Sequence, residues 1–184
     1  MTASEQKKNT YSNRIYIWLL ILAAGLVAFD QLMKHAAVSA LKDKPAIILI
    51  QGVLELRYLE NQGAAFGILQ NRQVVITIIT ILFLILALFV IIKIPKNRYY
   101  LPALIAVTFL FAGAIGNFID RTMNKYVVDF IYFSIIDFPI FNVADIYVTL
   151  SMTAIIIMLL FKYKDGDLDF FKKSRKETDE EDQT

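Results

Sequence analysis

The sequence contains no cysteine and a single histidine, His35, among its 184 residues. Without cysteine the chain cannot form a disulfide-stabilised scaffold, a zinc ribbon or a thiol nucleophile. A single histidine excludes a metal site built from several histidines and leaves one candidate for a histidine-dependent catalytic triad. The formal net charge is only +2, which is too small to indicate a nucleic-acid-binding protein.

Charged residues are also scarce, at 20%, whereas hydrophobic residues make up 57% of the chain. A soluble domain of this size could not bury so much apolar side chain. The composition therefore indicates an integral membrane protein of one domain. Any acid–base chemistry in such a chain is expected to use carboxylates.

Four apolar stretches, residues 15–37, 74–92, 101–119 and 141–161, are long enough to cross a bilayer, which takes roughly 20 residues of helix. All four are expected to be helices, because lipid offers the backbone no other hydrogen-bond partner. We therefore predict an all-α integral membrane protein with four transmembrane helices. A small extracytoplasmic β element and an interfacial loop or helix between helices three and four complete the expected fold.

The link between the second and third stretches is short and purely basic, with Lys93, Lys96 and Arg98 and no acid. Because Lys and Arg are enriched in cytoplasmic loops, we expect both termini in the cytoplasm and the two longer loops outside. The first stretch could instead be a cleaved signal sequence. Its length, and the presence of Asp30 and Lys34 near its end, argue against that alternative.

The two longer loops and the tail have different characters. Apolar and charged side chains alternate over residues 54–58, and this period of two predicts a β hairpin or small sheet on the outer membrane surface. The loop at 121–140 is rich in aromatic and aliphatic residues and is expected to lie in the interface. The mixed charges beyond suggest a membrane domain over 1–163 and a disordered cytoplasmic tail over 164–184.

Polar residues of three predicted helices fall at a similar depth. With a rise of about 1.5 Å per residue, Asp30 lies roughly 21 Å from the cytoplasmic end of its span. Asn117 and Asp145 lie at roughly 24 Å, and Asp120 at roughly 28 Å. Acids near an interface can reach water on their own, but the accompanying asparagines favour a shared site in the outer third of the membrane.

Within two helices, polar side chains also share a face. Asn117, Asp120 and Arg121 are spaced i, i+3 and i+4, which places them on one side of a helix. Asn142 and Asp145 are spaced i and i+3 at the start of the fourth stretch. Both groups therefore present an amide together with a carboxylate.

Other candidates have simpler alternatives. Gly113 and Gly116 either serve helix packing alone or make room for the site. Asp30 and Lys34 are spaced i and i+4 and could form no more than an intrahelical ion pair. Asp129 is a single acid within an apolar segment, so it needs a partner, and it is close enough in sequence to return to the ends of the third and fourth stretches.

Two carboxylates held close together in a partly dry site share a proton, since they cannot both ionise easily. One member can then activate a water while the other donates a hydrogen bond to a substrate carbonyl. This is the chemistry of aspartic proteases, and it needs neither a metal nor a cofactor. His35 is more plausibly an interfacial side chain. The residues alone leave open which pair acts among Asp30, Asp120, Asp129 and Asp145.

Five ordered elements of this sequence resemble those of the lipoprotein signal peptidases, or signal peptidase II. They are D-Q-x-x-K at 30–34, N-x-G-A-A-F at 61–66, G-A-x-G-N-x-x-D-R at 113–121, V-D-F at 128–130 and F-N-x-A-D at 141–145. One element alone would be weak evidence, but five in the same order on four spans extend the resemblance over about residues 15–162.

The resemblance implies an intramembrane aspartic endopeptidase in the bacterial cytoplasmic (inner) membrane. The family removes signal peptides from prolipoproteins just before a lipid-modified (diacylglyceryl) cysteine, so its partners are those substrates and membrane lipids, with no nucleic acid. By resemblance the catalytic pair is Asp129 and Asp145. The residues implied to bind substrate or support the site are Asp30, Lys34, Asn61, Gly63, Asn117, Asp120, Arg121 and Asn142.

Two other functions compete with peptidase chemistry. Intramembrane acids also relay protons in transporters and channels, and a membrane scaffold needs no chemistry at all. Transport predicts charges spread through the membrane depth. The second stretch carries none, and the other acids gather near one face, which favours a site open to one side.

Overall fold

The computed structural model describes residues 11–63, 72–164 and 166–171. Four long helices dominate these residues: α2 (Ile15–Leu41), α3 (Gln73–Lys93), α4 (Leu101–Asn124) and α5 (Val143–Phe161). All four are long and apolar enough to cross a membrane. The four predicted spans are confirmed, although α2 and α4 continue beyond the predicted ends.

The surfaces of the helices are apolar on the outside. Trp18 and Phe161, for example, are 70% and 81% exposed. Water would not favour such a surface, whereas lipid does. α4 lies among the other three helices, and small buried residues such as Ala112 and Gly113 let its neighbours approach closely.

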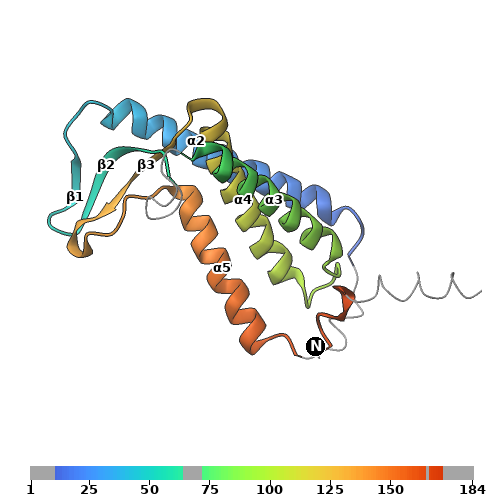
Figure 1. Ribbon diagram of the computed structural model, residues 1–184. Helices are drawn as coiled ribbons and strands as arrows, with labels where there is room; N and C mark the ends of the chain where they lie inside the picture. Colours follow the sequence, from blue (N-terminus) through green and yellow to red (C-terminus); the bar gives the residue numbers. More distant parts are fainter. Residues whose placement is uncertain (1–10, 64–71, 165, 172–184) are drawn as a thin grey trace, which may run out of the picture.

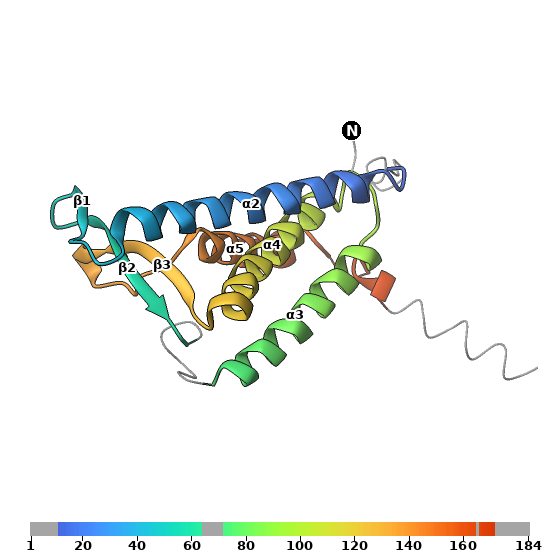
Figure 2. The same cartoon turned by 90° about the horizontal axis from the view of Figure 1, so that it is seen from above.

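A three-stranded antiparallel sheet lies at one end of the helices (Figure 1). Its strands are β1 (Ile47–Ile50), β2 (Leu54–Asn61) and β3 (Val127–Phe133), in the order β1-β2-β3. The predicted hairpin corresponds to β1 and β2. α2 extends past the other helices to reach this sheet (Figure 2).

The connection between α4 and α5 is more regular than the sequence suggested. We expected an interfacial loop or helix, and the short 3₁₀ helix η2 (Ser134–Ile136) fits that description. Most of the connection is nevertheless the strand β3, in register with β2 so that Asp129 pairs with Leu59. Strand pairing is decided by a distant segment, so a local pattern did not reveal it.

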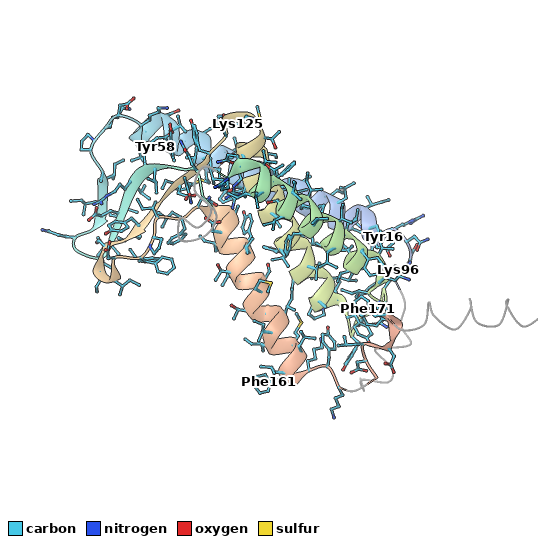
Figure 3. All side chains as sticks on the ribbon, viewed as in Figure 1. Tyr16, Tyr58, Lys96, Lys125, Phe161 and Phe171 are labelled. Atoms are coloured by element: carbon cyan, nitrogen blue, oxygen red, sulfur yellow. The ribbon has the colours of Figure 1, made fainter. Side chains whose placement is uncertain are left out.

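The opposite end of the helices is closed by aromatic residues that follow α5. A short 3₁₀ helix, η3 (Asp169–Phe171), places the Phe170 ring against the Tyr100 ring at 5.5 Å. Figure 3 shows Phe171 at this end of the molecule, and Tyr58 and Lys125 at the sheet end. Residues 166–171 thus contact the start of α4. The rest of the predicted tail lies outside the described residues, and the domain boundary stays a prediction.

Candidate functional site

Asp129 lies in the middle of β3 and is only 1% exposed. Both of its carboxylate oxygens accept a hydrogen bond from an amide. Asn61 Nδ2, from the last residue of β2, lies 2.9 Å from Oδ2. Asn142 Nδ2, at the start of α5, lies 2.6 Å from Oδ1. The neighbouring elements β2 and α5 therefore supply the hydrogen-bond partners that a buried carboxylate requires.

Asp145 is placed by a capping box at the beginning of α5. The Asn142 side chain accepts from the Asp145 backbone N–H at 3.1 Å, and the Asp145 carboxylate accepts from the Asn142 N–H at 3.1 Å. These bonds satisfy groups that a helix start leaves unpaired. Asn117 Nδ2 of α4 also donates to Asp145 Oδ1 at 2.8 Å.

Asn142 connects the two acids. It is fully buried, and its amide donates both to Asp129 and, at 3.1 Å, to the Asn117 oxygen. Asn117 in turn donates to Asp145. Asp129 and Asp145 come from different elements, yet a single amide network holds both. The spacing of Asn142 and Asp145 in the sequence was the signal for this part of the site.

The surroundings of Asp129 favour its protonated form. Burial raises the pKa of Asp129 from its usual value to about 7, and the negative charge of Asp145 acts in the same direction. Hydrogen bonds from Asn61 and Asn142 oppose this shift but do not cancel it. Near neutral pH the pair can therefore hold one proton, since ionising the buried Asp129 beside the charge of the half-buried Asp145 is unfavourable.

A second polar layer, from α2 and α4, lies behind the pair. Lys34 Nζ lies 2.9 Å from Asp30 Oδ2, 3.1 Å from Asp120 Oδ2 and 2.9 Å from Asn117 Oδ1. Asp30 and Lys34 thus form the ion pair that their spacing allowed, but they also join two helices. Gln31 Nε2 donates to Asp30 and to Asp120 Oδ1, at 3.2 and 3.1 Å.

Gln31 was not among the candidate site residues, although it lies within the D-Q-x-x-K element. Its position directly after Asp30, an acid within an apolar stretch, was the sequence feature that could have identified it as a site residue. Besides the two carboxylates, Gln31 Nε2 lies 3.1 Å from the Gly116 carbonyl oxygen. Its role depends on contacts between α2 and α4 that no spacing within one helix could reveal.

Two glycines of α4 make room for this layer. A Cβ on Gly116 would lie 2.5 Å from Asp30 Oδ2, and one on Gly113 would lie 2.6 Å from the Ala144 carbonyl oxygen. Real Cβ atoms do not approach other atoms this closely, so side chains here would force the helices or Asp30 to move. The absence of a side chain at Gly116 therefore serves both the close packing of the helices and the placement of Asp30.

Arg121 links the site to the end of β2. Its guanidinium donates to the Gly63 carbonyl oxygen at 3.0 Å, and the Gly63 N–H donates to Asn61 Oδ1 at 2.9 Å. The charges of Asp129 and Asp145 attract the same guanidinium. Residues 64–66 of the N-x-G-A-A-F element lie outside the described residues.

His35 is not part of this network. It is exposed, and its Nδ1 lies 2.8 Å from the Gln31 carbonyl oxygen one turn earlier in α2. Across residues 11–63, 72–164 and 166–171, no group of three or more histidine, cysteine or acidic residues is arranged to hold a metal ion. The side chains gathered at the site are carboxylates, amides, a lysine and an arginine.

Membrane-length helices and a small sheet bring the buried Asp129 and the half-buried Asp145 into one hydrogen-bond network, which are the features of a polytopic membrane protein with a candidate acid-pair site. The family model described as signal peptidase (SPase) II matches residues 22–161 of the chain. The chain therefore belongs to the signal peptidase II family, and its apolar helices agree with a multi-pass bacterial membrane protein.

Individual relatives extend this finding. The chain is 41% identical over 153 residues to the lipoprotein signal peptidase of Brevibacillus brevis, covering 82% of this chain and 97% of the relative. It is 40% identical over 153 residues to that of Streptococcus thermophilus, with 83% and 97% covered. A bacterial membrane enzyme solved by the in meso method at 2.3 Å is 37% identical, with a TM-score of 0.73 over 85% of this chain and 96% of that one.

Proposed function

We propose that this protein is an aspartic endopeptidase that cleaves signal peptides from bacterial prolipoproteins before the lipid-modified cysteine. Membership of the signal peptidase II family supports the substrate class. The observation that carries the mechanism is the joint binding of the Asp129 and Asp145 carboxylates by one amide network, formed by Asn142 and Asn117.

In the proposed reaction the pair begins with one shared proton. The ionised carboxylate removes a proton from water, and the water oxygen forms a bond to the scissile carbonyl carbon. The protonated carboxyl gives its proton to the carbonyl oxygen, which produces a tetrahedral diol. The carboxyl that took the proton from water then gives it to the peptide nitrogen as the C–N bond breaks. A hydroxyl of the diol returns its proton to the other carboxylate, which leaves a carboxylic acid, an amine and a pair that again holds one proton.

The contacts of the other acids favour Asp129 and Asp145 as the reacting pair. Both oxygens of Asp30 are engaged, one by Lys34 and Gln31 and the other by the Ala144 N–H at 2.9 Å. Asp120 is held in the same way by Lys34, Gln31 and a backbone amide. The Lys34 ammonium thus binds Asp30 and Asp120, which leaves Asp129 and Asp145 as the pair bound by side-chain amides.

We assign supporting roles to the remaining side chains. Asn61, Asn117 and Asn142 orient the two carboxylates, because each donates to at least one of them or to another member of the network. Arg121 holds the Gly63 carbonyl and, with it, the end of β2 beside Asp129. No step of the proposed reaction uses a metal or a cofactor.

The basic link between α3 and α4 supports an orientation with both termini in the cytoplasm. The sheet and the acid pair then lie near the extracytoplasmic face, where membrane lipids surround the helices and prolipoproteins arrive. Single cysteines at the exposed positions Gln51 and Arg98 test this orientation. We expect an impermeant reagent to label Gln51→Cys from outside and to leave Arg98→Cys unlabelled, and the reverse pattern would contradict it.

Cleavage of a diacylglyceryl-modified prolipoprotein by the purified protein tests the function itself. We expect the wild-type protein to release the signal peptide and Asp129→Asn to lose nearly all turnover while still binding the substrate. The same prolipoprotein without its lipid is the matched substrate control. Near wild-type cleavage by Asp129→Asn would make the assignment of the pair wrong, and absence of cleavage by the wild type would favour a transporter or scaffold.

A further inference from the structure

The buried ammonium of Lys34 lies between α2 and α4. Lys34 is 2% exposed, and Asp30 and Asp120 are 0% and 3% exposed. A charge so far from water is tolerated only when hydrogen-bonded partners surround it. Its partners come from α2 and from α4, so the cluster fixes the position of these helices relative to each other.

Each acid of this cluster also holds a backbone amide of another element. Asp30 Oδ1 accepts from the Ala144 N–H at 2.9 Å, and Ala144 immediately precedes Asp145. Asp120 Oδ2 accepts from the Val128 N–H at 3.1 Å, and Val128 immediately precedes Asp129. The backbone just before each member of the proposed pair is therefore anchored to a carboxylate bound to Lys34.

A third contact reaches the pair through a side chain. Lys34 donates to Asn117 Oδ1 at 2.9 Å, which leaves Asn117 Nδ2 to donate to Asp145. The orientation of this amide is decided by the donor in front of its oxygen, because an amide with nitrogen and oxygen exchanged would face Lys34 with a second donor. Lys34, together with the Asn142 amide that donates to the same oxygen at 3.1 Å, therefore determines which atom of Asn117 faces Asp145.

We propose that Lys34 is the positioning residue that sets the separation and orientation of Asp129 and Asp145, acting through Asp30, Asp120 and Asn117. This inference rests on the proposed function, because it assigns a purpose to the geometry of that pair. β3 and α5 each carry one acid of the pair. Asp120 connects the backbone of β3 to the Lys34 ammonium, and Asp30 connects the backbone of α5 to the same ammonium. Reacting groups need placement within about 0.5 Å, and an error of about 1 Å can cost on the order of a hundredfold in rate.

A simpler role for Lys34 is to neutralise two buried acids so that the protein folds. Gly116→Ala separates the two roles because it changes no charge. The added Cβ would lie 2.5 Å from Asp30 Oδ2, so Asp30 must move, and the Ala144 amide bound to it is expected to follow. Gly25→Ala, in the same bundle, is the matched control, because its Cβ would have no heavy atom within 4 Å.

Lys34→Met combined with Asp30→Asn and Asp120→Asn is the second test. This triple variant removes all charge from the cluster and retains amide oxygens that can accept from Ala144 and Val128. Neutralisation alone predicts that the triple variant works as the wild type does. Positioning by Lys34 predicts at least tenfold lower kcat with KM changed less than threefold.

Both variants are measured with two lipopeptides that differ at the scissile group. One carries a secondary alcohol in place of the carbonyl, which both carboxylates can contact, and the other carries a methylene. We expect the wild type to bind the alcohol at least a hundredfold more tightly, as transition-state analogues do. The ratio of the two affinities is a property of folded sites only, so partial unfolding does not alter it.

The expected result is a ratio at least tenfold smaller in Gly116→Ala and in the triple variant, with Gly25→Ala unchanged. An unchanged ratio and kcat in either variant would overturn the positioning role. Failure of the proposed function is a separate outcome, since it would appear as cleavage by Asp129→Asn in a protein with intact Lys34.

Discussion

Asp129 and Asp167 are both buried carboxylates, but they lie at opposite ends of the helices. Asp129 accepts from two side-chain amides, and one of these amides belongs to the network that also holds Asp145. Asp167, 7% exposed, accepts from the Tyr99 hydroxyl at 2.7 Å and from the Lys164 N–H at 3.0 Å. Its donors close a turn and fasten that turn to the start of α4.

The aromatic surroundings of Asp167 strengthen this structural role. The Tyr100 hydroxyl donates to the Asp167 carbonyl at 2.7 Å, and the Tyr163 ring stacks on the Tyr100 ring at 5.4 Å. Burial raises the pKa of Tyr99 to about 12, and its hydrogen bond to Asp167 contributes, so Tyr99 remains a proton donor. Burial of an acid is thus not itself a sign of catalysis, and the proposal for Asp129 rests on the amide network that it shares with Asp145.

The largest expected difference between the two ends is in turnover. Asp129→Asn and Asp145→Asn should each lower kcat at least about a thousandfold, and the double variant should be little worse, because residues that act as one unit are not additive. The measurement is cleavage of the lipid-modified prolipoprotein in detergent. Asp167→Asn is the control at the other end, with kcat expected within about twofold of wild type. A double variant whose losses multiply would show that the two acids act separately.

Arg121→Lys should have the next largest effect. Lysine keeps the positive charge but loses the planar guanidinium that reaches the Gly63 carbonyl, so we expect kcat/KM to fall about 10- to 100-fold. Arg57→Lys is the matched control, since that side chain is exposed and pairs with Glu55 at 2.8 Å on β2. Unchanged turnover in Arg121→Lys would remove Arg121 from the site.

The pH dependence of kcat should follow from the shared proton. With the Asp129 pKa raised to about 7, the pair loses its proton as pH rises through that value, and no acid remains to protonate the carbonyl. We therefore expect kcat to fall about tenfold per pH unit well above pH 7. Melting temperatures over the same range provide the control, and a flat rate up to pH 9 would disagree with the raised pKa.

The smallest expected effect concerns the end that carries no proposed chemistry. Tyr100→Phe removes the hydroxyl that donates to the Asp167 carbonyl and should lower the free energy of unfolding by about 1 kcal/mol, with no change in kcat. Tyr16→Phe should cost less, because its hydroxyl is exposed and lies 3.3 Å from the Ile92 carbonyl. A tenfold loss of activity in Tyr100→Phe would show that the two ends are coupled.

Several features of the protein followed from local sequence alone. Long apolar runs specify membrane helices because lipid leaves the backbone no alternative, and the confirmed spans reflect that constraint. The alternation over residues 54–58 specified a strand, since successive side chains of a strand point to opposite faces. The i, i+3 spacing predicted Asn142 and Asp145 one turn apart on the fourth helix, whereas the structure places Asn142 just before α5 and joins the two residues in a capping box.

Tertiary structure decided the features that depend on distant segments. The placement of β3 beside β2, the contact of Gln31 with Asp120 and the packing of residues 166–171 each join parts of the chain far apart in sequence. The residues alone left four acids open, and only the resemblance to a family selected two. Periodicity reports which face a side chain occupies. Hydrogen bonds across elements determine which carboxylates are held by Lys34 and which are joined through Asn142 and Asn117.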